Sequence, residues 1–176
     1  MPLSPGPRAL SDPALLEELR AHALDLHVRR LTYLAEDVRK ESGRRMPRFD
    51  PQDGGVQAKT LLLFDAATSS EFASLNANDE SSARLHAAVD EAGIPRTSLV
   101  VCREIPGRYV EPLMGLLEQV RSVLLLGGSA RRTWWESAVE REGLTVFNCP
   151  QPTDDYPEAH DNIVRALREA HRLAGA

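Results

Sequence analysis

Gly127, Gly128 and Ser129 are residues whose types and spacing suit anion binding. They directly follow the apolar run 122–126 and open a segment of helical periodicity. Backbone N–H groups at such a helix start can surround a phosphate or another anion. The segment is not a P-loop, because the lysine of that motif is missing and the spacing differs. We expect Gly128 and Ser129 to bind phosphate, with a tight turn that holds no ligand as the alternative.

Polar residues also end two other short apolar runs, 61–64 and 99–102, which are followed by Asp65 and by Arg103. The segment 144–147 predicts a fourth strand, and the segment 148–150 follows it. Continuous apolar runs of this length are typical of strands that are buried on both faces of a sheet. Open α/β sheets bind their ligands at the carboxyl ends of such strands. We therefore expect these loops to lie along one edge and to line any site.

The apolar runs alternate with segments of helical periodicity. This pattern predicts a three-layer α/β/α sandwich around a four-stranded, mainly parallel sheet. Residues 1–11 are rich in Pro and Ser and are expected to be disordered, and residues 12–176 are expected to form one domain. Within it we expect an N-terminal helix over 12–42, capped by Ser11 or Asp12 and long enough to break partway, and a core over 60–173.

The composition is typical of a soluble globular protein, with 42% hydrophobic and 27% charged residues in a chain of 176. No apolar run approaches the roughly 20 residues that cross a bilayer, and the first residues lack the features of a signal peptide. We therefore expect a cytoplasmic location and no membrane contact. Two cysteines, and histidines without ligand spacing, predict no metal, no metal cluster and no cofactor.

The distribution of charge bears on nucleic-acid binding. The net charge of −5 disfavours indiscriminate binding, which depends on Lys and Arg that neutralise phosphates. Basic residues nonetheless concentrate in the segment 29–48. We interpret this segment first as a solvated helix face and second as a contact for a polyanion.

Residues 60–173 resemble the uracil-DNA glycosylase superfamily, and more closely its single-domain bacterial members without an iron–sulfur cluster. The order and spacing of four stretches carry the resemblance: NDESSARL (78–85) with EAGIPR (91–96), LVVCREIP (99–106), VLLLGGSAR (123–131) and PQP (150–152). The resemblance implies the α/β/α fold and the hydrolysis of N-glycosidic bonds in DNA. That reaction requires a base that is flipped out of the stack and held by hydrogen bonds and stacking.

The resemblance also assigns roles to residues that depart from the family's motifs. The loop 64–68 corresponds to a Gly-Glu-Ala-Pro-Gly type motif, which places Asp65 at the water-positioning Glu and Ala66 beside the base. Arg103 stands where the family has an Asn that reads the uracil edge. Phe72 is the candidate for the aromatic residue that stacks on the base.

The family's late His-Pro-Ser motif corresponds to Cys149, Pro150 and Gln151. Its His stabilises the charge that develops on the departing base, and a neutral cysteine is a weak donor. Cys149 is therefore a poor replacement, and a buried small residue is the alternative. Asp154 and Asp155 follow in the loop that inserts into DNA in the family, where carboxylates would meet phosphates of like charge.

Two other candidates also have ordinary structural roles. Asp65 could cap its own loop, and Arg103 could form a salt bridge to Glu104 or Asp65. We expect a uracil-DNA-glycosylase-like protein with a degenerate site and residual or altered base-excision activity on single- or double-stranded DNA.

The alternatives come from different functional classes. One is a catalytically inactive member of the fold that binds a nucleic acid, a nucleotide or a protein partner. Another is an enzyme that acts on a different small ligand. A buried ion pair of Asp65 with Arg103 that fills the cleft would favour the inactive alternative, and an open cleft would favour the enzymes.

Overall fold

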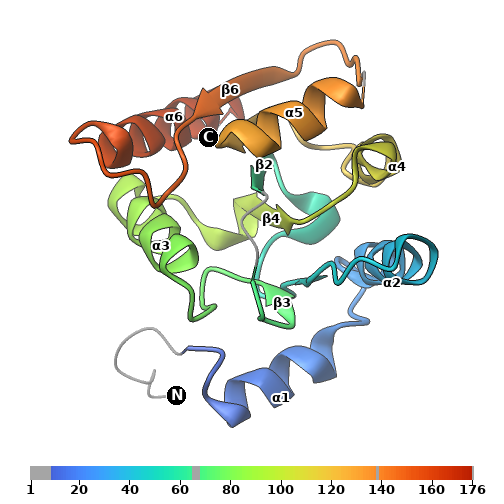
Figure 1. Cartoon of the computed structure of the whole chain (residues 1–176). Coiled ribbons are helices and arrows are strands. Elements are labelled where there is room, and N and C mark those ends of the chain that lie inside the picture. The colour runs from blue at the N-terminus through green and yellow to red at the C-terminus, as the bar shows by residue number, and fades with distance from the viewer. Residues whose placement is uncertain (1–8, 65–67, 138, 176) are drawn as a thin grey trace.

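The main sheet consists of four parallel strands in the order β4-β2-β5-β6. The computed structural model describes residues 9–64, 68–137 and 139–175. The strands are β2 (Thr60–Phe64), β4 (Leu99–Arg103), β5 (Ser122–Leu126) and β6 (Thr145–Cys149). Helices cover both faces of this sheet (Figure 1), which confirms the predicted α/β/α sandwich with a four-stranded parallel sheet.

The helices divide between the two faces as Figure 1 shows. On one face lie α3 (Glu80–Ala92) and α6 (Ala159–Leu173), and on the other α2 (Arg29–Ser42), α4 (Val110–Leu116) and α5 (Gly128–Glu136). Successive strand residues point to opposite faces. Leu61 and Leu63 of β2 therefore pack with α2 and α4, whereas Leu62 and Phe64 pack with α3 and α6. Burial on both faces explains why β2, β4 and β5 are rich in consecutive apolar residues.

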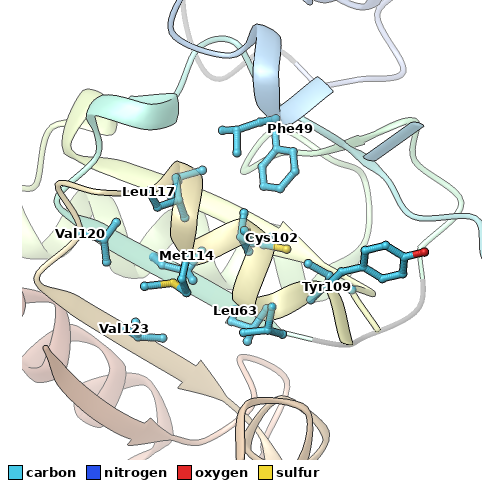
Figure 2. Packing of buried hydrophobic residues seen from close by; sticks show 14 of the residues in the cluster. Phe49, Leu63, Cys102, Tyr109, Met114, Leu117, Val120 and Val123 are labelled. Atoms are coloured by element: carbon cyan, nitrogen blue, oxygen red, sulfur yellow. The ribbon is translucent and has the colours of Figure 1, made fainter. Parts of the chain in front are cut away.

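Figure 2 shows the core on the side of α2, α4 and α5. Met114 and Leu117, from α4 and its end, share one cluster with Leu63 and Val123 of the sheet. The ring of Tyr109 belongs to the same cluster, while its hydroxyl points away and donates a hydrogen bond to Glu41. This contact joins the loop after β4 to α2.

The segment expected to form a helix over 12–42 contains two helices. The helix is therefore not continuous, and it breaks partway, as its length suggested. The first helix is α1 (Pro13–His22), and Asp12 caps it by accepting a hydrogen bond from the Ala14 N–H at 2.9 Å. Near the break, the His27 carbonyl accepts from the Val56 N–H at 2.8 Å. His27 Nε2 also lies 2.7 Å from the Pro51 carbonyl oxygen. A tertiary partner thus binds the His27 carbonyl, which a continuous helix would use itself, and the contact of the His27 ring with Pro51 holds the chain near the break.

The end of the segment expected to be disordered is packed against the domain. The Leu10 side chain is buried beside Leu15, Leu19 and Phe72. Its backbone N–H donates to the Asn76 carbonyl at 2.9 Å. Residues 9–11 are therefore part of the folded domain, which corrects the boundary at residue 11.

A second, much smaller sheet lies beside β4. It pairs β1 (Arg48–Phe49) with β3 (Phe72–Ala73) in parallel. The sequence analysis did not predict these strands, because two residues are too few to show the alternation of a strand. Three short 3-10 turns complete the described elements: η1 (Gly55–Gln57), η2 (Arg96–Ser98) and η3 (Gly107–Tyr109). None of the helices in the described ranges has the length and apolar character that crossing a membrane requires.

Candidate functional site

The predicted cleft lies at the carboxyl edge of the sheet. The chain first adds β4 on one side of β2 and later β5 on the other, so the topological switch point lies between β2 and β5. The loop 65–67 after β2 lies outside the described residues, and with it the predicted site residues Asp65 and Ala66. The structure describes the loops after β4, β5 and β6.

Arg103, at the end of β4, is fully buried and held by internal contacts. Its Nη1 donates to both carboxylate oxygens of Asp79, at 2.9 and 3.0 Å, and to Ser82 Oγ at 3.0 Å. The guanidinium also stacks on the Phe64 ring, 4.4 Å from its centroid. The guanidinium thus has no exposed surface to offer to a base, which corrects the predicted substrate contact.

Asp79 has two structural roles. It caps α3, because its Oδ2 accepts from the Ser82 N–H at 3.1 Å, and it neutralises Arg103. Burial opposes its ionisation, but the charge of Arg103 and hydrogen bonds from Arg103 and Ser82 outweigh burial and hold the pKa of Asp79 below its usual value. A carboxylate that stays ionised is the complement that a buried arginine requires.

Cys149, at the end of β6, lies in the core with Leu124, Leu126 and the buried face of α6. Burial raises the pKa of its thiol to about 12, although the charge of Arg131 opposes this shift. A buried thiol that stays neutral in the physiological range cannot supply the charge stabilisation that the reaction needs. Burial and the raised pKa of the thiol disfavour a catalytic role of Cys149, which stays a prediction.

Phe72 does not line the cleft. It belongs to β3, its side chain is fully buried, and it packs with Leu10, Leu15, Leu19 and Ala77. No face of the ring is open to stack on a base, which corrects the predicted role. The segment that buries it precedes residue 20, in the part of the chain that the resemblance does not cover.

The glycine turn after β5 has the predicted form. Gly127 adopts φ = 100°, and a Cβ there would lie 2.3 Å from Cγ of Gln151, so only glycine fits. Gly128 and Ser129 are exposed in the first turn of α5. Gln151 is half-buried, and its backbone N–H donates to Asp154 at 2.9 Å. Phosphate binding by Gly128 and Ser129 and substrate binding by Gln151 stay predictions.

In comparisons with known proteins, no family model and no curated protein matches the chain. The resemblance to uracil-DNA glycosylases therefore stays a prediction. Among the described residues, no group of three or more His, Cys, Asp or Glu is placed to hold a metal ion.

One polar cluster that the sequence analysis missed lies at the amino end of β4. Arg96 of η2 donates to Asp50 at 2.7 Å and to Asp53 at 2.8 Å, and its third nitrogen donates to Asn76. Both carboxylates are buried, and Ser74 donates to Asp50 at 2.5 Å. Burial and the neighbouring Asp50 raise the pKa of Asp53 to about 8. Two carboxylates on one arginine leave a negative charge that a proton on Asp53 removes.

A groove on the other side of the molecule was also missed. It has a volume of about 910 Å³ and lies between β6 and α6, where Arg131, Arg165 and Arg172 line it. The sequence signal was present in the spacing of Arg165, Arg168 and Arg172 along the last helix. It was not recognised because nothing in the sequence shows that β6 ends the sheet.

Proposed function

We propose that this chain is a catalytically silent member of the uracil-DNA glycosylase superfamily that binds a protein partner and does not cleave N-glycosidic bonds. The observation that carries the proposal is the state of Arg103. At the position that reads the base in the family stands a buried cation that is neutralised by Asp79 and stacked on Phe64.

Two further observations support the loss of catalysis. Excision needs a group that stabilises charge on the leaving base, and the Cys149 thiol is buried and neutral. It also needs a surface on which the base stacks, and the Phe72 ring is covered by α1 and Leu10.

Charge favours a protein over DNA as the partner. The chain carries a net charge of −5, and DNA binding depends on cations that neutralise phosphates. Asp154 and Asp155 occupy the loop that would face a duplex in the family. Burial of Arg103 removes one cation that the cleft could have presented to a phosphate.

A single-turnover assay with the protein in excess over uracil-containing single- and double-stranded DNA at low salt tests the loss of catalysis. Wild type and Asp65→Ala are compared, with an active uracil-DNA glycosylase as the positive control. We expect no cleavage by either protein. Cleavage by wild type that Asp65→Ala abolishes would contradict the proposal and would assign water positioning to Asp65.

A further inference from the structure

The outer side of β6 is a strand edge with outward-facing backbone groups. Among the described strands, β6 pairs only with β5 and stands last in the strand order. Thr145 donates to the Arg121 carbonyl at 2.9 Å, and Gly127 donates to the Cys149 carbonyl at 3.0 Å. Residues that face the partner strand alternate along a strand, so the backbone of Val146 and of Asn148 faces away from β5. Such groups are a template for another strand.

The groove between β6 and α6 runs beside this edge. Its apolar lining includes Phe147 and Ala166, and both are half-buried. Arg165, Glu169 and Arg172 line it from α6, spaced three and four residues apart as on one helix face. A strand added to β6 would direct every second side chain toward this helix. The groove therefore has the shape to take alternate side chains of an extended chain.

The groove is basic although the protein is acidic. Its lining includes Arg131, Arg165, Arg168 and Arg172 against Asp154 and Glu169. Arg172 pairs with Glu169, whereas no described residue pairs with the Arg165 guanidinium. An excess of positive charge favours an occupant of opposite sign.

We propose that an extended acidic segment of a partner protein adds to β6 as a fifth strand and places its acidic side chains on Arg165 and Arg172. This inference rests on the proposed binding role and names the surface and the partner chemistry. Main-chain hydrogen bonds to Val146 and Asn148 supply affinity, and the arginines supply selection, as in other cases of strand addition.

Two other occupants fit less well. A second copy that paired edge to edge across a two-fold axis would bring the same arginines of both copies to one interface, where like charges repel. A nucleic acid offers phosphates to Arg165 and Arg172 but has no peptide groups to pair with Val146 and Asn148.

Fluorescence anisotropy with the full-length protein tests the proposal. The probe is a fluorescein-labelled peptide of about eight residues, long enough to span one strand, that alternates Glu and Val. The matched control peptide has Lys in place of every Glu. We expect micromolar affinity for the Glu peptide at low salt and binding of the Lys peptide that is weaker by about tenfold or more.

Two variants separate the backbone contacts from the charges. Asn148→Pro removes an N–H that faces outward, a position at which edge strands tolerate proline, and it blocks strand addition. Arg165→Glu with Arg172→Glu reverses the charge of the groove. We expect each variant to weaken the Glu peptide by about tenfold or more. Arg132→Glu, at an exposed position of α5 outside the groove, is a charge-reversal control and leaves affinity unchanged. Circular dichroism melting checks that every variant is folded.

The outcomes that overturn the inference are distinct. Equal affinity for the two peptides, or binding that Asn148→Pro leaves intact, would overturn it. A single-stranded oligonucleotide that binds more tightly than the Glu peptide would also overturn it, as would a dimer of the free protein that Asn148→Pro dissociates. If the protein neither binds the peptide nor cleaves DNA, this inference is refuted and the proposed loss of catalysis stands. Cleavage of uracil-containing DNA refutes the proposed function, whatever the peptide does.

Discussion

The two side edges of the sheet differ in how the chain treats them. Along β4, the carbonyl of Leu99 faces outward and accepts a hydrogen bond from the Gly54 N–H at 2.8 Å, and β1 and β3 lie against the same strand (Figure 1). Along β6, the described chain adds no strand beyond Val146 and Asn148. One edge is covered and the other is left accessible.

The covered edge is fastened by the Arg96 cluster. Arg96 joins η2 to Asp50 and Asp53 of the preceding segment and to Asn76 after β3. Three pieces of chain that are distant in sequence thus meet at one guanidinium, which fixes the segment carrying Gly54 against β4.

The open edge lacks the usual protections against pairing. The five residues of β6, TVFNC, contain no proline and no charged residue, which are devices that natural edge strands use against unwanted pairing. The N-terminal segment therefore covers the β4 edge of the sheet, whereas the β6 edge stays accessible beside the basic groove.

The largest expected effect is at the covered edge. Arg96→Met leaves the carboxylates of Asp50 and Asp53 buried without their cation, because their side chains are 0% and 1% exposed. We expect a loss of about 3–5 kcal/mol in the free energy of unfolding, measured by urea denaturation. Arg84→Met, which breaks a surface pair with Glu80, is the control and should cost less than about 1 kcal/mol. Equal losses in the two variants would show that the cluster does not fasten the edge.

A smaller effect is expected from Gly54→Ala. A Cβ on Gly54 would lie 2.0 Å from the Thr97 carbonyl oxygen, so the backbone must move away from η2, directly before β4. We expect a loss of about 1–3 kcal/mol by urea denaturation, as for other overpacked sites. In Gly115→Ala the new methyl group meets no atom within 4 Å, and this helix position should gain about 0.5–1 kcal/mol. A neutral Gly54→Ala would contradict the close approach.

The Arg96 cluster should also make stability depend on pH. Because the pKa of Asp53 is raised to about 8, the folded state holds a proton that the unfolded state loses above about pH 4. The unfolding free energy of wild type should therefore fall, relative to that of Asp53→Asn, as pH rises from about 5 to 8. Urea denaturation at several pH values measures this difference. A difference that is constant, or that grows with pH, would contradict the raised pKa of Asp53.

The sequence was sufficient to predict the sheet but not the pairing inside the site. The run Leu61–Phe64 and its counterparts in β4 and β5 are strands that burial on both faces makes continuously apolar, whereas β6 is partly exposed and contains Thr145 and Asn148. The Arg103–Asp79 pair joins residues 24 positions apart on β4 and α3. Which carboxylate meets Arg103 depends on how that helix packs on that strand, and no local pattern encodes this.

The error at Phe72 has a similar cause. An aromatic residue near a predicted cleft suggested stacking, but its environment is set by Leu10 and α1, far upstream in sequence. The break near His27 likewise depends on Val56 and Pro51, which are distant partners. Local periodicity predicts helices and strands, whereas the burial of Phe72 and the helix break near His27 depend on tertiary contacts.

Hydrogen exchange at the β6 amides measures whether β6 can receive a fifth strand. We expect fast exchange at Val146 and Asn148 in the free protein and slow exchange at Phe147, whose N–H faces β5 in the ladder. Saturation with the Glu peptide should slow Val146 and Asn148 and leave Phe147 unchanged. Protection of Val146 and Asn148 already present in the free monomer, or no change at saturation, would contradict the claim that β6 receives a fifth strand.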